Sequence, residues 1–574
     1  MKMHLRYFLA AAWLTGFTGA ALAADAGHKN VQYVVIKGLS GNYLSGEFAR
    51  NDGDMDAAVR RLGIVHRDDP KNSTITQQLQ GLLLLQGKVD EAVSLASADS
   101  ADNESSMFSD LLLTLRNIKN NKLDQAADVL DAAADDHSPQ LWQPLLSAWV
   151  ELGQHKPKKP FLIQDFRENV GRAAPLVNYH LALLNAQAGF TAAAAKNFRD
   201  AISDPKNAPE RVMRRLIAFY KHHDKPSLLT PIVKIWREAH PAGGAPENLA
   251  PVVTAKDGAA EVMFTLGGIM LGSGETSDAA IYFQLALYLK PGADDAALAL
   301  GDAYSSLGQY ASADQVYGRI PEDSPLYARA RLHVAVNEDS LGQLNDALAL
   351  LDTLAKRPSQ ASDALITKGD LLRLHKRYAE AAAAYGEGLS LLPSLKEDYW
   401  PVLFARGACL EREGKWEQAK TELREALKIE PGQPDVLNYL GYGMIEHGET
   451  LALARTMIEQ AVRARPDDPQ ILDSMGWALY LSGDYVRAAT YAERAVDLMP
   501  DDATVNDHLG DVYWRVGRKI EARYQWKRSL SFLPGTALAG DIQKKLKSGL
   551  PPVALAGSGP PRVAARAAGD TVTQ

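Results

Sequence analysis

Apolar residues recur at helical spacing along most of the chain, and small residues recur among them at fixed distances. In the clearest stretch, Leu472 and Leu479 are seven positions apart, almost two helical turns, and Gly476 lies between them. A second helical stretch follows, in which Ala488 and Ala495 have the same spacing and therefore lie on one side. Small side chains at these places allow two antiparallel helices to approach closely. The pattern predicts a helical hairpin.

This pattern repeats through the second half of the chain. A small residue in the first helix of each hairpin is followed twelve positions later by an alanine, seven later by a second small residue, and about five after that by a proline. The first small residue recurs at intervals of 34, 34, 34, 38, 34, 35 and 34 residues, at Gly267, Gly301, Ala335, Gly369, Gly407, Gly441, Gly476 and Gly510. This period predicts a solenoid of stacked hairpins, each of which buries its apolar face on its neighbours.

The repeat resembles that of the tetratricopeptide repeat (TPR) family. Several family positions are filled together in one unit, by Leu266, Gly267, Ala279, Phe283, Ala286 and Pro291. The pattern is more eroded in the N-terminal half, where Ala182, Ala194 and Phe198 belong to the most convincing unit. The resemblance implies an all-α fold, a right-handed superhelical solenoid of about a dozen TPR-like helical hairpins.

Composition divides the chain into five segments. Residues 1–23 have the basic start, apolar stretch and small-residue ending of a secretory signal peptide, with an uncleaved anchor as the alternative. Residues 24–240 are predicted to form a divergent TPR-like helical array, and residues 241–260, which contain several prolines and glycines, a linker. We expect a regular TPR array over residues 261–548 and a disordered Pro/Ala-rich tail over residues 549–574.

A cleavable signal peptide directs the mature chain out of the cytoplasm, and we expect it in the periplasm. The only cysteine, Cys409, lies far from the signal cleavage site, where a bacterial lipoprotein has its lipidated cysteine. No later segment is apolar enough to span a membrane. The net charge of −8 argues against nucleic acid as the main partner. We therefore expect protein partners and no direct membrane insertion after signal cleavage.

The sequence carries no familiar motif of catalysis or cofactor binding, such as HExxH, CxxC, GxSxG or the P-loop. His222 and His223 are adjacent and point to different sides of a helix, which favours a solvated helix end over a metal site. Paired aspartates lie at predicted turns, where they would cap the next helix: Asp68-Asp69, Asp135-Asp136, Asp467-Asp468 and Asp501-Asp502. We predict no catalytic residue, cofactor or metal.

An enzyme with its site in the divergent N-terminal half is an alternative from another class. A cleft with convergent titratable groups between residues 24 and 260 would identify it.

In the TPR family the first helix of each hairpin lines a concave groove, and the resemblance implies which residues face it here. They lie three positions before the first small residue and one and four positions after it. In three successive units they are Asn438, Tyr442, Ile445, Asp473, Trp477, Tyr480, Asp507, Asp511 and Trp514, with Arg515 beside the last. Aromatic side chains next to polar groups suit an extended peptide or a protein surface. The alternative is that these aromatics pack between hairpins.

Residues 435–530 have a narrower resemblance, to the C-terminal repeats of bacterial envelope TPR proteins. The run ILDSMGW, which starts at Ile471, is the most distinctive piece. That group includes lipoprotein adaptors that hold a periplasmic carboxyl-terminal processing protease and its substrates. Members of that group are typically lipid-anchored, and this chain lacks the anchoring cysteine. The resemblance implies a non-catalytic scaffold or adaptor in the cell envelope, with the partner left open and a protease with its substrates as one candidate. A scaffold for polysaccharide synthesis or export is the alternative within the same class.

Overall fold

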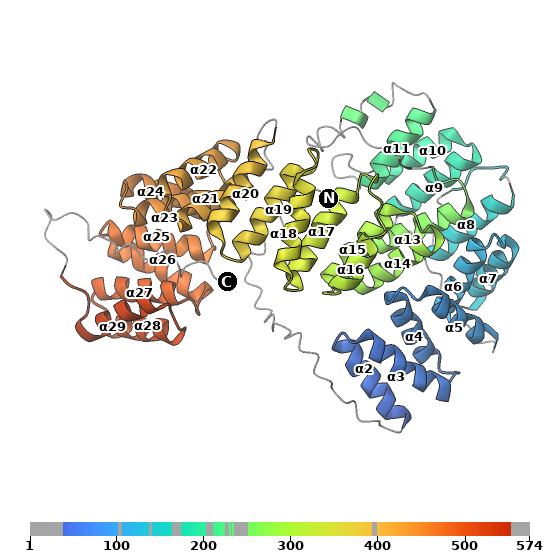
Figure 1. Cartoon of the computed structure of the whole chain (residues 1–574), viewed down its shortest axis with the longest axis horizontal. Coiled ribbons are helices and arrows are strands. Elements are labelled where there is room, and N and C mark those ends of the chain that lie inside the picture. The colour runs from blue at the N-terminus through green and yellow to red at the C-terminus, as the bar shows by residue number, and fades with distance from the viewer. Residues whose placement is uncertain are drawn as a thin grey trace. The chain divides into compact units, whose positions relative to one another are not determined.

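The computed structural model describes residues 38–101, 106–136, 141–155, 157–162, 174–202, 210–223, 229–230, 232–234, 249, 251–392 and 399–552. All regular elements in these ranges are helices, which confirms the all-α prediction (Figure 1). The predicted signal peptide and residues 553–574 of the predicted tail lie outside the described residues. The described chain forms two compact units, an N-terminal unit that ends at Leu341 and a C-terminal unit that starts at Gly342.

The N-terminal unit is built from helices that mostly pair with their neighbours along the chain. They are α2 (Leu39–Asn51), α3 (Met55–Asp68), α4 (Ser73–Leu85), α5 (Val89–Ala101), α6 (Met107–Lys119), α7 (Leu123–Asp136), α8 (Trp142–Gln154), α9 (Ala174–Ala188), α10 (Thr191–Ala201), α11 (Glu210–His222), α13 (Ala255–Gly272), α14 (Thr276–Leu289), α15 (Asp294–Ser306), α16 (Tyr310–Tyr317) and α17 (Tyr327–Ser340).

This unit is more than a row of hairpins, because α13 and α14 also pack against helices from much earlier in the chain. α13 lies against α8 and α9, and α14 lies against α4, α5 and α6. Gly258 of α13 faces Trp149 of α8, whose ring lies 2.0 Å from the position that a Cβ atom on Gly258 would take. The Tyr304 hydroxyl donates a hydrogen bond to the Leu85 carbonyl at 2.7 Å. The early helices and α13–α15 thus share one packed interior.

The predicted linker, residues 241–260, lies inside the N-terminal unit. Its last residues form the first turns of α13, which begins at Ala255. Thr254 and Asp257 start this helix as a capping box, in which each side chain accepts a hydrogen bond from the other residue's backbone N–H. The division between the two compact units falls after Leu341. α13 and α14 belong to the N-terminal unit because they pack on α4, α5, α6, α8 and α9.

The C-terminal unit is a row of helical hairpins and covers the later part of the predicted regular array. Its helices are α18 (Leu344–Ala355), α19 (Ala361–Leu374), α20 (Tyr378–Ser390), α21 (Trp400–Arg412), α22 (Trp416–Ile429), α23 (Pro434–Glu446), α24 (Leu451–Ala464), α25 (Pro469–Leu481), α26 (Tyr485–Leu498), α27 (Ala503–Arg515), α28 (Lys519–Ser531) and α29 (Thr536–Ser548). Hairpins follow one another from α19 to α28, and one apolar core runs through them from Ile366 to Ile542. No helix in the described ranges is both long and apolar enough to cross a membrane.

Several of the predicted small-residue positions fit against an aromatic ring sixteen residues later. A Cβ atom added to Gly301 would lie 2.3 Å from the ring of Tyr317, a distance that unbonded carbon atoms do not adopt. Four such pairs are Gly267 and Phe283, Gly301 and Tyr317, Gly369 and Tyr385, and Gly510 and Trp526. These positions require glycine, and their contacts confirm the predicted register of the hairpins.

Aspartates begin helices at two of the four predicted turns. Asp468 and Asp502 accept hydrogen bonds from backbone N–H groups in the first turns of α25 and α27. The prediction is wrong for Asp68-Asp69, because α4 starts further on and its cap is Asn72. It is also wrong for Asp135-Asp136, which form the last turn of α7.

Candidate functional site: an aromatic surface on three repeats

The predicted groove residues lie on the first helices of three consecutive hairpins in the C-terminal unit. Asn438, Tyr442 and Ile445 are on α23, Asp473, Trp477 and Tyr480 are on α25, and Asp507, Asp511, Trp514 and Arg515 are on α27. α25 packs against both α23 and α27. The repeat therefore brings the three sets of residues side by side, as the pattern predicts.

The centre of this surface is a stack of three rings. The Trp477 ring stacks on those of both Tyr480 and His508, with centroids 4.8 and 4.2 Å away and interplanar angles of 8° and 14°. Trp477 and Tyr480 are half-buried, so part of each ring faces outward. Arg515 Nε donates a hydrogen bond to the Tyr480 hydroxyl at 3.3 Å. We call Trp477, Tyr480, His508, Trp514 and Arg515 the aromatic surface.

His508 belongs to this surface although the sequence pattern does not single it out. It lies two residues before Gly510, outside the positions that the family resemblance marks. Its Nδ1 contacts both carboxylate oxygens of Asp473, at 3.0 and 2.8 Å. Asp473 and His508 are both buried, so this carboxylate fixes the histidine ring against Trp477 and does not face a partner.

Asp507 and Asp511 are buried beneath α29 and hold that helix on the last hairpin. Lys545 Nζ of α29 lies 2.8 Å from both Asp507 oxygens and 2.8 Å from Oδ2 of Asp511. Trp526 Nε1 donates a hydrogen bond to Oδ1 of Asp511 at 2.9 Å. The two acids are predicted to bind a partner, but in the structure they bind Lys545 and Trp526 of the chain itself.

Acidification is expected to stabilise the folded region around Asp511. Burial, followed by the neighbouring charge of Asp507, raises the pKa of Asp511 to about 6, even though Lys545 acts in the opposite direction. A carboxyl group with a higher pKa in the folded than in the unfolded chain adds stability as the pH falls from about 7 toward its ordinary value. When the pH is lowered from about 7 to about 5, we expect the hydrogen-exchange protection of α27–α29 to rise roughly tenfold more in the native protein than in Asp511→Asn. Parallel changes in the two proteins would contradict this assignment.

The other predicted residues divide between surface and interior. Trp514 is half-buried with its ring centroid 5.4 Å from that of Trp526. Tyr442 and Asn438 are also half-buried, and the Asn438 Oδ1 atom is buried without a hydrogen-bond donor from the described residues. Ile445 is buried and belongs to the core. Six of the residues therefore stay predicted contacts for a partner: Asn438, Tyr442, Trp477, Tyr480, Trp514 and Arg515.

The acid beside the small residue has a structural role in other repeats as well. Asp302 accepts a hydrogen bond from the Tyr317 hydroxyl, and Asp370 accepts one from the Tyr385 hydroxyl, each at 2.7 Å. The last hairpin uses a tryptophan in the same way. Glycine, the aspartate after it and an aromatic residue fifteen positions later thus form one contact within a hairpin. This spacing is visible in the sequence and identifies such acids as structural.

A buried ionic network in the N-terminal unit

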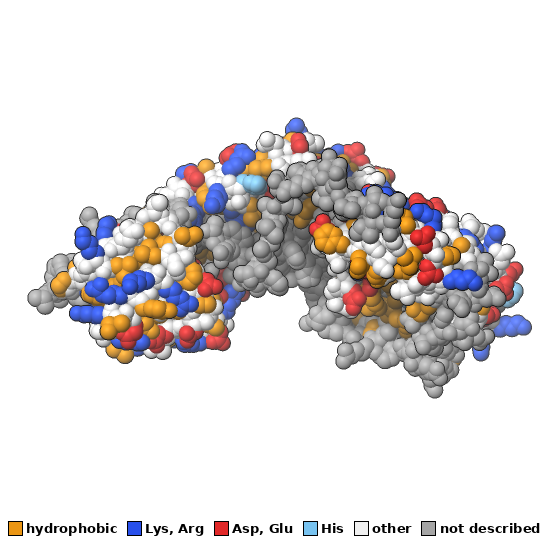
Figure 2. Space-filling view, turned by 90° about the horizontal axis from the view of Figure 1, so that it is seen from below, with side chains coloured by type: hydrophobic (Ala, Val, Ile, Leu, Met, Phe, Trp, Pro, Cys, Tyr) orange, Lys and Arg blue, Asp and Glu red, His pale blue; other side chains and the backbone are white. Residues whose placement is uncertain are grey.

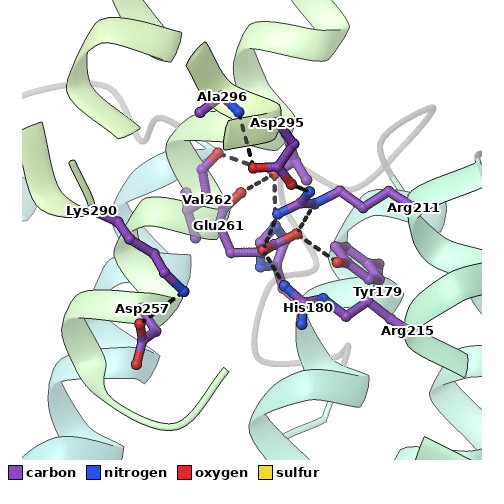
Figure 3. A network of polar contacts seen from close by, with 11 residues as sticks. Tyr179, His180, Arg211, Arg215, Asp257, Glu261, Val262, Lys290, Asp295 and Ala296 are labelled. Atoms are coloured by element: carbon purple, nitrogen blue, oxygen red, sulfur yellow. Dashed lines mark hydrogen bonds and ion pairs between the residues drawn. The ribbon is translucent and has the colours of Figure 1, made fainter. Parts of the chain in front are cut away.

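The N-terminal unit brings several titratable groups together around Glu261 of α13 (Figure 3). Arg211 of α11 donates to both Glu261 oxygens, from Nε at 2.5 Å and from Nη2 at 2.7 Å. Arg215 Nη2 donates at 3.1 Å, and the Tyr179 hydroxyl of α9 donates at 2.6 Å. Arg211 also pairs with Asp295 of α15. The network therefore connects four helices.

The charges in this network shift each other's pKa values. Burial alone raises the pKa of Glu261, but the guanidinium groups of Arg211 and Arg215 together hold it well below its usual range. Burial and the Glu261 charge raise the pKa of Tyr179 above its ordinary value. Burial lowers the pKa of His180 to about 4, and its Nε2 lies 2.9 Å from the Thr265 hydroxyl.

These groups converge but do not form an accessible cleft. Tyr179, His180 and Glu261 are exposed by 1%, 0% and 3%, and Arg215 is buried with them, while Arg211 and Asp295 at the edge of the network are half-buried. The described residues also hold no group of three or more histidine, cysteine or acidic side chains that could bind a metal. The arrangement is suited to joining helices, since a substrate has no access to the carboxylate.

Residues 337–394 and 445–503 match one tetratricopeptide repeat pattern, and residues 400–433 match a second. These segments are tetratricopeptide repeats. No curated protein sequence matches the chain.

Similar solved structures include the Cut9–Hcn1 hetero-tetramer of the APC/C, with 14% identity, 91% of this chain and 98% of that chain covered, and a TM-score of 0.38. The pilF protein of Pseudomonas aeruginosa has 21% identity, with 43% and 95% covered and a TM-score of 0.29. MamA of AMB-1 has 20% identity, with 29% and 96% covered and a TM-score of 0.26. At these scores no conclusion about function follows.

Proposed function

We propose that the chain is a non-catalytic scaffold of the bacterial cell envelope that binds protein partners in the periplasm. Tetratricopeptide repeats support the general role, because stacked hairpins present an extended surface for binding other proteins. The signal-like residues 1–23 support the location. The closed ionic network of the N-terminal unit favours a scaffold over an enzyme, since its titratable groups are already bonded to one another.

The observation that carries this proposal is the stack of Trp477, Tyr480 and His508. Aromatic rings supply much contact area at a small cost in conformational entropy, and they concentrate binding energy at interfaces. Here the rings are fixed from behind by the Asp473 carboxylate and bordered by the Arg515 guanidinium. A rigid aromatic patch with a polar border suits a segment of a protein partner.

We propose a periplasmic protease and its substrates as the partners. The narrower resemblance of residues 435–530 to envelope adaptor proteins supports this choice, and the aromatic surface lies within that segment. Enzymes of polysaccharide synthesis or export are the alternative, and the same experiment separates the two.

Capture of partners from envelope extract tests this proposal. We expect the tagged native protein to retain a protease and its substrates, and Trp477→Ala to retain about a tenth as much or less, because loss of a central aromatic residue costs roughly 2 kcal/mol of binding. Tyr524→Ala is the matched control, since Tyr524 is an aromatic residue of α28 with 64% exposure. Equal recovery on all three proteins would place the binding surface elsewhere, and recovery of glycan synthases would favour the alternative.

A further inference from the structure

The chain's own C-terminal residues lie at one end of the aromatic surface. α29 ends at Ser548, and Gly549 turns the chain with a φ of 72°. A Cβ atom added to Gly549 would lie 2.0 Å from Cζ2 of Trp514, so the backbone rests directly on this ring. Residues 549–552, which we call the C-terminal strap, were predicted as the start of a disordered tail. They are held because α29 delivers them to Trp514, a contact that composition does not reveal.

The strap contacts the surface through both a side chain and its backbone. Leu550 is half-buried and packs on the same apolar core as Trp514. Arg515 Nη1 donates a hydrogen bond to the Pro551 carbonyl at 2.7 Å, while its Nε donates to the Tyr480 hydroxyl. Arg515 thus connects the strap backbone to the ring stack of the preceding repeat.

The sequence of the strap, Gly-Leu-Pro-Pro, indicates what this place recognises. Proline has no N–H group, and consecutive prolines favour an extended conformation whose carbonyls stay open to donors. Proteins that bind such segments present aromatic faces for the proline-bearing chain. Here Trp514 supplies the face, on which Gly549 rests, and Arg515 supplies the donor to the Pro551 carbonyl, while the rings of Pro551 and Pro552 are exposed.

We infer that Trp514, Arg515 and Tyr480 bind an extended, proline-containing segment of a partner, and that the strap occupies this place in the free chain. The inference rests on the proposed function and names the partner chemistry at that surface. A partner segment displaces the strap but not α29, because Lys545 anchors α29 to two buried carboxylates.

The charge around this place adds a further condition on the partner segment. Lys519 Nζ and Arg523 Cζ lie 5.3 and 5.5 Å from the centroid of the Trp514 ring. Figure 2 shows basic side chains among hydrophobic ones on the face of the C-terminal unit that it presents. A segment that lacks basic residues avoids repulsion from these two cations, and the strap meets this condition.

Gly549→Ala in the full chain tests this inference. The new methyl group clashes with Trp514 and is strained at positive φ, so it moves the strap off the ring while every other residue is kept. The probe is a fluorescent synthetic peptide with the sequence of residues 548–554, SGLPPVA, and fluorescence anisotropy reports its binding. We expect about tenfold tighter binding to Gly549→Ala than to the native chain, because a site that is mostly occupied binds with reduced apparent affinity.

Three controls make the result specific. Gly540→Ala adds a methyl group to α29 where no atom lies within 4 Å, and it should bind the peptide like the native chain. Adding Arg515→Ala to Gly549→Ala should abolish the gain, and so should replacing both prolines of the peptide by alanine. A chain that ends at Ser548 lacks the strap. It should bind the peptide as tightly as Gly549→Ala is expected to, and it replaces that variant if the substitution disturbs α29.

The inference is overturned if neither Gly549→Ala nor the chain ending at Ser548 binds the peptide more tightly than the native chain does. It is also overturned if Arg515→Ala leaves the gain unchanged. Its failure can be told from failure of the proposed function, since the peptide titration uses no partner. Capture of a protease without peptide binding refutes only the inference, and peptide binding without capture refutes only the proposed function.

Discussion

Glu261→Gln is expected to destabilise the N-terminal unit by about 3–5 kcal/mol, the usual cost of removing one partner from a buried ion pair. Glu261 accepts hydrogen bonds from Arg211, Arg215 and Tyr179, so its loss of charge leaves two guanidinium groups without their main counter-charge. These groups lie on α9, α11 and α13. Hydrogen exchange resolved by peptide should show lower protection in all three helices.

The control and the pH dependence follow from the same geometry. Glu275→Gln removes an exposed charge at the start of α14 and should change stability by less than about 0.5 kcal/mol. The pKa of Glu261 is lowered on folding, so its contribution is complete above its ordinary value near 4.5 and is lost as the pH falls below that value. The difference in the free energy of unfolding between the native protein and Glu261→Gln should therefore be constant from pH 7 to about pH 5 and shrink in stronger acid. If the two proteins are equally stable at pH 7, the network does not hold these helices.

Gly267→Ala and Gly268→Ala are expected to have opposite effects although they are neighbours on α13. A Cβ atom on Gly267 would lie 2.6 Å from the Phe283 ring, and such overpacking costs about 1–3 kcal/mol. Gly268 is exposed and has open space around it, so alanine there should stabilise the helix by roughly 0.5–1 kcal/mol.

Urea unfolding of the two variants, read out by hydrogen exchange in α13 and α14, measures this difference. The pair is its own control, because both changes add one methyl group to the same helix. Equal effects of the two substitutions would show that the repeat register near Gly267 is misplaced.

The repeat architecture could be predicted from sequence because the contacts that define it join residues close together in the chain. Gly267 and Phe283, or Gly301 and Tyr317, lie sixteen residues apart within one hairpin, and a fixed spacing identifies such a pair. The side-by-side arrangement of Trp477, Tyr480 and Trp514 follows from the same period.

The roles of individual polar residues depend on contacts that the repeat spacing does not predict. Asp507 and Asp511 looked like exposed acids of a groove, but Lys545 reaches them from a helix that lies beyond the last regular repeat. The contact between Tyr179 and Glu261 joins residues 82 positions apart. Such pairings arise from tertiary packing, so a repeat pattern cannot reveal them.

The contact between a small residue and its partner sixteen residues later also bears on how this array tolerates insertions. The hairpin of Gly441 carries one extra residue before Ala454. There a Cβ atom added to the glycine would lie 2.9 Å from Cγ1 of Ile458, seventeen positions on. The extra residue is accommodated between the two helices while their contact is kept. Because each pair lies within one hairpin, duplication or deletion of a whole hairpin carries both members together. The array can thus change length in evolution by whole repeats, whereas either residue of a pair can change only together with the other.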